Sequence, residues 1–274
     1  MPLLLCFAAV SLLCVFPLSY CTLHLGVGTS LLLSLAAFFL LHILYLLFFW
    51  VVSLFVKTDR PLERQNPLCR FAVAVTSSVI DFYAGLRPVV SGMEKLPKEG
   101  RFLFVCNHRS MFDPLITLDT LHACNLAFIT KPENLKIPIG GRIAYGAGFL
   151  SIDRDNDRKA LKTILTAADY MKRSLCSIAV YPEGTRSKTG ELLPFRAGCF
   201  KAAQRAGVPI VVAAIHGTEK HQRMTLFSGT RVFLDILEVI PAETVCAMRT
   251  DALSEYIRGL IQADLDSVEA AKEV

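Results

Sequence analysis

The stretch FLFVCNHRSMFDP, residues 102–114, passes from an apolar run through a polar turn to a helix start. The apolar run contains aromatic and β-branched side chains and has the length of a buried strand. Asn107 ends the run, and Asp113 followed by Pro114 is typical of the first residues of a helix. This order predicts a strand that leads through a short loop into a helix.

His108 and Asp113 lie five residues apart in this stretch. On one continuous helix their side chains would point roughly 140° apart and would not meet. The turn between them allows a contact and places His108 on a loop at the carboxyl end of a strand. Open α/β sheets bind their ligands at that edge. Asp113 by itself also fits a simple helix N-cap, so two interpretations are open for this residue.

The alternation of strand-length apolar runs and helical patterns continues through the chain. A short strand is expected at Val89-Val90, and longer strands at residues 102–106, 126–130, 149–152, 176–181, 209–215 and 231–237. Helical spacing lies between them at residues 114–123, 156–173 and 197–206, and a last amphipathic helix covers residues 253–265. Such alternation predicts an α/β fold with a largely parallel sheet covered by helices.

The first 56 residues differ from the rest because they contain no Lys, Arg, Asp or Glu. Two apolar segments occupy about residues 3–20 and 31–56, and the second would be about 39 Å long as a helix. That length exceeds a hydrocarbon core of roughly 30 Å. A secretory signal peptide is disfavoured, since no basic residue precedes the first segment and a second one follows it. We therefore expect a membrane-embedded helical hairpin that turns near residues 24–30.

Charged residues return directly after the hairpin, and basic ones outnumber acidic ones among residues 57–70. This excess of positive charge predicts that the following domain lies on the cytoplasmic side of the membrane. The nine cysteines include no CxxC pair, which agrees with reduced thiols in a cytoplasmic domain. The expected organisation is an anchor at residues 1–56, a juxtamembrane connection at 57–87 and an α/β domain at 88–274.

The composition also limits the partners of this chain. The formal net charge of +5 suits an anionic membrane surface or an acidic substrate, and it is too small to indicate a nucleic-acid-binding protein. No group of His, Cys, Asp and Glu has the spacing of a metal site, so no metal is expected.

Three further motifs contain polar residues, and the first two of them lie at predicted strand ends. YPEGTRS, residues 181–187, follows an apolar strand, and its Arg186 offers a planar fork suited to phosphate. GFLSIDR, residues 148–154, ends with Arg154, and PFRAGCFKAA, residues 194–203, contains a turn and a helix start. In a parallel sheet these ends meet the histidine loop at one edge. They predict a phosphate-handling site with a general base.

These motifs resemble those of the glycerolipid acyltransferases, in particular the 1-acylglycerol-3-phosphate acyltransferases. NHRSMFD is similar to the NHxxxxD motif of that family, and YPEGTRS to its FPEGTRS motif. GFLSIDR is similar to the glycerophosphate-binding motif between them, and VPIVVAAI, residues 208–215, to an apolar fourth motif. The four stand in the family's order and spacing within about residues 88–240. Tyr181 and Ser151 depart from the pattern, because the family commonly has Phe at both positions.

The resemblance implies a role for each motif. His108 is the general base that takes a proton from the acceptor's free hydroxyl as this attacks an acyl thioester, and Asp113 orients and stabilises the imidazole. Backbone N–H groups after Asn107 are the implied donors to the thioester oxyanion. The implied binding residues for the acceptor phosphate are Arg154, Glu183, Gly184, Thr185, Arg186 and Lys131.

The implied reaction is acyl transfer to lysophosphatidate, which gives phosphatidate for phospholipid biosynthesis at a membrane. The acyl donor is an acyl-CoA or an acyl-carrier-protein thioester, and no cofactor is implied besides this co-substrate. One alternative is a glycerol-3-phosphate acyltransferase or an acyltransferase that remodels lysophospholipids. Another is a non-catalytic, membrane-anchored lipid-binding protein on the same fold, and the intact His108–Asp113 pair argues against it.

Two of the implied binding residues also have a second interpretation. Glu183 either contacts the substrate or serves as a brace that pairs with Arg186 or with backbone N–H groups. Arg154 either binds phosphate or forms an ion pair with one of its neighbours Asp153, Asp155 and Asp157.

Overall fold

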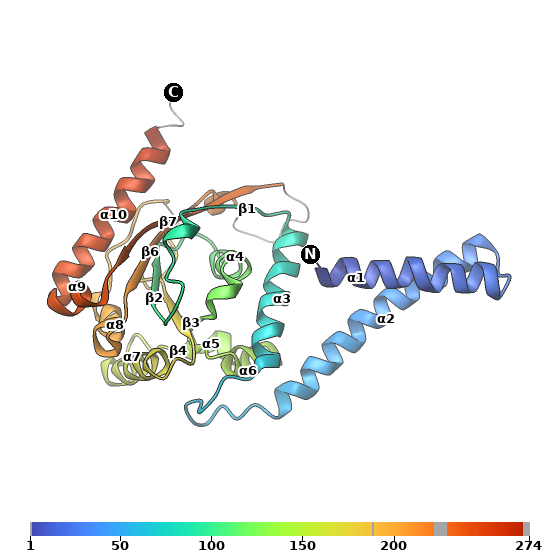
Figure 1. Ribbon diagram of the computed structural model, residues 1–274, viewed down its shortest axis with the longest axis horizontal. Helices are drawn as coiled ribbons and strands as arrows, with labels where there is room; N and C mark the ends of the chain where they lie inside the picture. The colour runs from blue at the N-terminus through green and yellow to red at the C-terminus, as the bar shows by residue number, and fades with distance from the viewer. Residues whose placement is uncertain (1, 188, 222–228, 271–274) are drawn as a thin grey trace.

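The protein is described by a computed structural model that covers residues 2–187, 189–221 and 229–270. Within these residues the centre is a seven-stranded sheet with the order β1-β7-β6-β2-β5-β3-β4 (Figure 1). The strands are β1 (Arg87–Ser91), β2 (Leu103–Cys106), β3 (Leu126–Thr130), β4 (Leu150–Ser151), β5 (Ser177–Val180), β6 (Ile210–His216) and β7 (Arg231–Ile240). Neighbouring strands run parallel except β6 and β7, which are antiparallel. The predicted largely parallel sheet is confirmed.

The central strands are almost entirely apolar because helices cover both faces of the sheet. Every residue of β2, β5 and β6 is buried. A strand with one wet face would alternate apolar and polar residues, whereas these three are apolar except for Ser177 at the start of β5 and His216 at the end of β6. Their bounds agree with the predicted runs to within one residue at each end.

The helices form one layer on each face of the sheet (Figure 1). The first layer contains α7 (Asp157–Lys172), α8 (Lys201–Ala206) and α10 (Thr250–Ala270). The second contains α3 (Pro67–Ala84) and α4 (Asp113–Thr120). The remaining short helices are α5 (Pro132–Leu135), α6 (Gly140–Gly146) and α9 (Ala242–Ala247).

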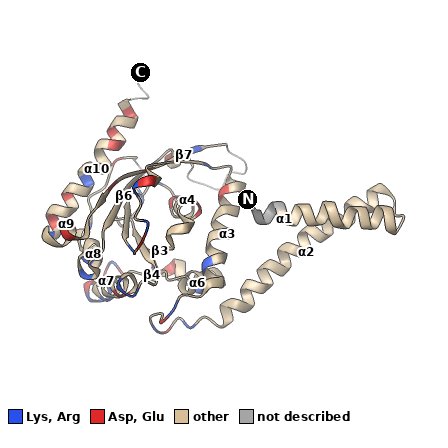
Figure 2. Cartoon of the chain, viewed as in Figure 1, with Lys and Arg blue, Asp and Glu red and all other residues tan. Residues whose placement is uncertain are grey.

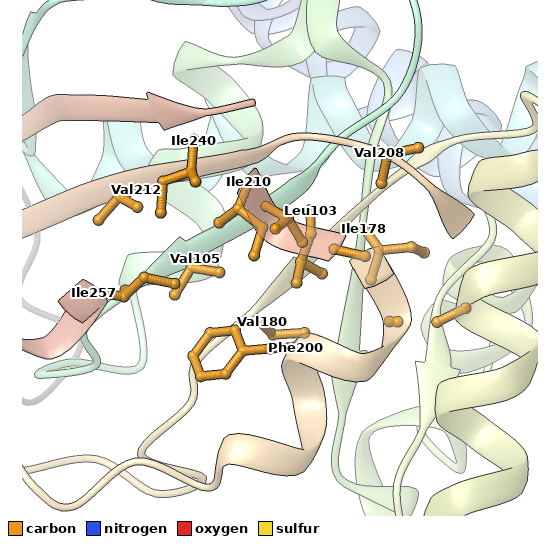
Figure 3. Close-up of a cluster of buried hydrophobic side chains, with 14 of the residues drawn as sticks. Leu103, Val105, Ile178, Val180, Phe200, Val208, Ile210, Val212, Ile240 and Ile257 are labelled. Atoms are coloured by element: carbon orange, nitrogen blue, oxygen red, sulfur yellow. The ribbon is translucent and has the colours of Figure 1, made fainter. Parts of the chain in front are cut away.

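Successive side chains of the central strands enter two separate cores, because side chains alternate along a strand. Figure 3 shows the core below α7, α8 and α10, where Leu103, Val105, Ile178, Val180, Ile210 and Val212 gather with Phe200 and Ile257. The other core joins the alternate residues Phe104, Cys106 and Ala179 to Phe112 and Ile116 at the start of α4. Adjacent residues at the end of a strand therefore face opposite layers.

The segment predicted as a connection, residues 57–87, contains helix α3. Asn66 caps this helix, since its side chain accepts hydrogen bonds from the N–H groups of Leu68 and Cys69, and Pro67 occupies the first turn. The helix ends at Gly85, whose φ of 70° is a left-handed conformation that favours glycine. α3 packs on α4 and on α6, so it covers the sheet and also borders the N-terminal helices.

The N-terminal residues form a helical hairpin that projects from the domain (Figure 1). α1 (Pro2–Val10) continues through π-helical turns at Ser11–Val15 and Leu18–Thr22, and α2 (Val27–Leu54) returns beside it. The hairpin carries no Lys, Arg, Asp or Glu (Figure 2). Among the described residues, α2 is the one helix that is long and apolar enough to cross a membrane. This composition suggests that the protein associates with membranes.

The last turns of α2 belong to the packed part of the molecule. Phe49 and Val52 of α2, and Val56 just after it, are buried against the side chains of α3 and α6, among them Cys69 and Ile143. Most large apolar side chains earlier in α2 are exposed. The carboxyl end of α2 is thus the part of the hairpin that is buried in the domain, while α1 and Tyr45 of α2 also contact α3.

Phe200 offers a test of the core below α8, where its ring is fully buried. We expect Phe200→Ala to lower the free energy of unfolding by about 3–5 kcal/mol, because it removes apolar contact and leaves a cavity. The matched control is Leu165→Ala on α7, where the side chain is 40% exposed and the loss should stay near 0.5 kcal/mol, roughly the surface value. Denaturant unfolding in detergent measures both. Equal losses would contradict the assigned core.

Candidate active site

The histidine loop begins where β2 is tied to its neighbour β6. Asn107 is almost fully buried, and its side chain forms two hydrogen bonds with the backbone of Ile215. Nδ2 donates to the Ile215 carbonyl at 2.9 Å, and Oδ1 accepts from the Ile215 N–H at 2.8 Å. These bonds satisfy both ends of a buried amide and fix the exit of β2. His108 consequently starts at the carboxyl edge of the sheet.

One oxygen of Asp113 closes this loop. Its Oδ2 accepts from His108 Nδ1 at 2.8 Å and from the backbone N–H groups of Arg109 and Ser110, each at 2.7 Å. The carboxylate is fully buried, while the His108 side chain is 17% exposed. The contact expected from the turn between His108 and Asp113 is therefore present.

The N-cap interpretation of Asp113 is wrong. α4 begins at Asp113 itself, Phe112 occupies the cap position, and no side chain caps the helix. The hydrogen bonds that Asp113 accepts come from residues that precede it, and its Oδ1 accepts none from any described residue. The reason is the direction of the loop, which folds three donors back over the carboxylate before the helix starts.

Aromatic stacking fixes the plane of the His108 ring. The ring lies 4.2 Å from that of Tyr181, centroid to centroid, at an interplanar angle of 9°. Tyr181 in turn stacks on Phe128 of β3 at 5.3 Å. Because a buried carboxylate can only accept, Nδ1 of His108 carries the hydrogen, and Nε2 then holds a free lone pair. The arrangement presents a histidine nitrogen that can take up a proton.

Glu183 is a brace behind His108. It is 5% exposed, and its Oε1 accepts from the His108 N–H at 2.6 Å while Oε2 accepts from the Leu193 N–H at 3.0 Å. Of the interpretations open for this residue, contact with backbone N–H groups is the one that the geometry bears out. Burial raises the pKa of Glu183 to about 7, against the opposing effect of the two N–H bonds.

The N–H groups after Asn107 do not face a site for an oxyanion, contrary to expectation. The N–H of His108 is bonded to Glu183, and those of Arg109 and Ser110 are bonded to Asp113. These three donors are engaged because the loop needs them to stabilise two buried carboxylates. Donors to an oxyanion must therefore come from elsewhere.

Arg109 and Ser110 hold the loop against two distant segments, and sequence reasoning missed both. Arg109 Nη2 donates to the Gly190 carbonyl at 2.7 Å, and its Nη1 lies 3.6 Å from Glu219 Oε2. Ser110 Oγ donates to the His221 carbonyl at 2.6 Å. The partners lie 81 to 111 residues away along the chain, so no local pattern could have indicated them.

A cavity of about 410 Å³ opens beside the loop, at the carboxyl ends of β3, β4 and β5. Its apolar lining comes from Ile129, Ile152, Leu161, Ile164 and Val180. Its charged lining comes from Arg154, Arg196, Lys201 and Asp157. Arg196 belongs to the PFRAGCF segment, which the sequence marked as a turn without assigning a ligand. An apolar cavity with a mainly cationic rim can hold an anion attached to an alkyl chain.

Only some of the predicted phosphate-binding residues line this cavity. Arg154 and Gly184 line it, whereas Glu183, Thr185, Arg186 and Lys131 do not. Thr185, Arg186 and Lys131 are exposed. Arg154 forms none of the ion pairs considered for it among the described residues, since Asp153 pairs with Lys159 instead, at 3.2 Å. The described part of the chain contains no group of His, Cys, Asp and Glu that could hold a metal ion.

Comparison with known proteins places the chain in a family. Residues 87–216 match the acyltransferase family profile. The 1-acyl-sn-glycerol-3-phosphate acyltransferase of Salmonella typhimurium is 30% identical over 177 residues, which cover 64% of this chain and 72% of that protein. The chain belongs to the 1-acylglycerol-3-phosphate acyltransferase family. The beta form of that enzyme from Homo sapiens is also 30% identical to this acyltransferase, over 174 residues that cover 63% of the chain and 62% of the human protein.

A solved structure supports the fold of this acyltransferase. The crystal structure of the 1-acyl-sn-glycerophosphate acyltransferase of Thermotoga maritima superposes with a TM-score of 0.61 at 24% identity. The match covers 83% of this chain and 89% of that protein. The similarity therefore includes more than the residues of the family profile.

Glu183 should give the stability of this acyltransferase a specific pH dependence. Its pKa in the folded chain, about 7, lies above the unfolded value of 4.5. Between these pH values the folded chain binds more protons than the unfolded chain. The contribution of Glu183 to the free energy of unfolding is therefore full below pH 4.5 and is lost as the pH rises to about 7. We expect the wild type to lose stability relative to Glu183→Gln from pH 5 to pH 8, by a few kcal/mol at most, since one pKa unit is about 1.4 kcal/mol.

Unfolding temperatures at the two pH values test this expectation. Glu191→Gln is the matched control, because Glu191 is exposed and the variant should keep the wild-type pH dependence. A Glu183→Gln variant whose stability changes with pH as the wild type does would show that Glu183 is ionised throughout this range.

Proposed function

We propose that this acyltransferase transfers an acyl chain from a thioester to the free 2-hydroxyl of lysophosphatidate, giving phosphatidate. The observation that carries the proposal is the His108–Asp113 pair, held by hydrogen bonds at the edge of a parallel sheet, beside a cavity with cations and apolar walls. The names of the matched relatives favour lysophosphatidate over glycerol-3-phosphate as the acceptor. The donor in this proposal is an acyl-CoA or an acyl-carrier-protein thioester, and the reaction needs no cofactor.

In the proposed mechanism His108 is the general base. Its Nε2 takes the proton of the acceptor hydroxyl while the oxygen attacks the thioester carbonyl and a tetrahedral intermediate forms. As the intermediate collapses, the carbon–sulfur bond breaks and the thiolate takes the proton back from Nε2. Asp113 stabilises the imidazolium between these steps and holds its tautomer. The acceptor oxygen is the nucleophile, so no enzyme nucleophile is required.

Arg154 is the proposed ligand of the acceptor phosphate, because its guanidinium lines the cavity and no described acidic residue forms an ion pair with it. Gly184 supports this assignment, since it lines the same cavity. Thr185, Arg186 and Lys131 remain part of the proposal through the motif resemblance. Glu183 acts in it through His108 and not through the substrate.

Asp113→Asn separates the charge of Asp113 from its size. Asparagine offers one oxygen in place of the carboxylate and cannot stabilise the imidazolium, so we expect kcat to fall by on the order of 10² or more. His108→Ala should be at least as damaging, while acceptor binding is retained. Asp119→Asn, on the same helix α4 but away from the loop, is the matched control and should keep the wild-type kcat. Near-wild-type turnover of Asp113→Asn would eliminate the dyad.

We also propose that residues 1–56 anchor the protein and that the domain faces the cytoplasm. The hairpin has no charged residue, and basic residues predominate directly after Val56. A lipid acceptor enters from the bilayer, so an anchor next to the domain would keep the site at the membrane surface.

Removal of residues 1–44 tests the anchor without exposing the core, because the variant keeps Phe49, Val52 and Val56, which pack on the domain. We expect it to partition less to membranes and to act poorly on lysophosphatidate in bilayers. It should still acylate the same acceptor in detergent micelles. A shortened chain that remained fully membrane-bound would contradict the assignment of the anchor to the hairpin.

A further inference from the structure

Arg196 lies outside the YPEGTRS motif in the sequence but contacts the turn that this motif forms. Its backbone N–H donates to the Pro182 carbonyl at 2.8 Å, and its carbonyl accepts from the Cys199 N–H at 3.2 Å. The first bond fixes the residue to the turn, and the second begins the helical turn that leads into α8. The position of Arg196 at the cavity is thus determined by backbone contacts.

Gly184 brings the guanidinium of Arg196 next to that of Arg154. A Cβ atom at Gly184 would lie 3.1 Å from Arg196 Nε and 3.7 Å from Arg154 Nε. Both side chains therefore pass close to the same glycine. The φ of Gly184, 74°, also favours glycine here. A side chain at this position would press on Arg196 and would be in van der Waals contact with Arg154.

The two guanidinium groups carry like charges and repel each other. Burial and the charge of Arg196 lower the pKa of Arg154, and the charges of Asp155 and Glu133 oppose this effect. Among the described residues, no ion pair within 4.0 Å and no hydrogen bond involves either guanidinium. Asp157 also lines the cavity, but it forms no such pair. Two like charges held together in this way would be stabilised by an anion between them.

The remainder of the cavity shows which anion fits. Its other walls are mainly apolar, so a ligand with an alkyl part suits it better than a free inorganic ion. A phosphate monoester carries about −1.5 to −2 charges near pH 7. Each of its free oxygens can accept from a planar guanidinium fork. A phosphodiester carries one charge and has one oxygen fewer for such contacts.

We infer that Arg196 is the second phosphate ligand of the acceptor site, and that the Arg154–Arg196 pair selects a phosphate monoester over a phosphodiester head group. This inference rests on the proposed function, because it assigns the cavity to the acceptor. It makes Arg196 a specificity-determining residue that distinguishes lysophosphatidate from lysophospholipids with larger head groups.

The test is a calorimetric titration of the full chain in detergent, without acyl donor. The two probes are a short-chain 1-acylglycerol-3-phosphate and the methyl ester of its phosphate, which differ in one charge. We expect the wild type to bind the monoester at least about tenfold more tightly, the range for charge-assisted hydrogen bonds. Arg196→Gln should lose this preference by weakening only the monoester, and Arg196→Lys should keep part of it. Arg205→Gln, on α8 but outside the cavity and exposed, should bind as the wild type does.

Two results would overturn the inference alone. An Arg196→Gln variant that weakens both probes equally would show that Arg196 only holds the turn in place, and one that keeps the preference would remove it from the site. In both cases the wild type would still prefer the monoester and acylate lysophosphatidate, so the proposed function would stand. A wild type that binds neither probe would overturn the proposed acceptor together with the inference.

Discussion

The hydrogen bonds to Asp113 Oδ2 determine the shape of the active-site loop, and the remaining features of the site depend on them. A buried carboxylate is tolerated only when donors surround it, and three donors from residues 108–110 meet this requirement. To supply them the chain must fold back over the start of α4. This loop conformation orients the His108 ring and places the hydrogen on Nδ1. Nε2 is therefore available to accept a proton. A second buried carboxylate, that of Glu183, holds the His108 N–H from the other side.

At the end of β5, successive residues contribute to the site from the two faces of the sheet. Val180 packs in the core on the α7 side and lines the cavity. The next residue, Tyr181, packs on the α4 side and stacks on His108, and it also lines the cavity. This separation follows from the alternation of side chains along a strand. Glu183 and Gly184 then follow in the turn, one bracing the histidine and the other making room for two arginine side chains. Five consecutive residues thereby link the base to the cavity.

The charge pattern of the whole chain is consistent with an enzyme that acts on an amphiphile. The hairpin is free of charge (Figure 2), and its attachment through Phe49 and Val52 places it beside α3 and α6. The cationic residues of the cavity lie at the edge of the sheet, beside apolar walls. A lipid with one phosphate and one acyl chain has the same division between a charged end and an apolar body. The family to which the chain belongs is in agreement with this pattern.

The sequence by itself determined the strands, the edge at which the site lies and the contact between His108 and Asp113. These features follow from short-range rules, since strand period, turn residues and a spacing of five act within one segment. Only the tertiary structure decided that Asp113 closes a loop instead of capping α4, that Glu183 is a brace, and that the N–H groups after Asn107 are already bonded. It also decided that Arg154 and Arg196 meet over Gly184. The reason is that these contacts join segments far apart in the chain, such as Glu183 and the His108 N–H at a sequence separation of 75. Their partners are determined by the packing of whole elements and not by any local pattern.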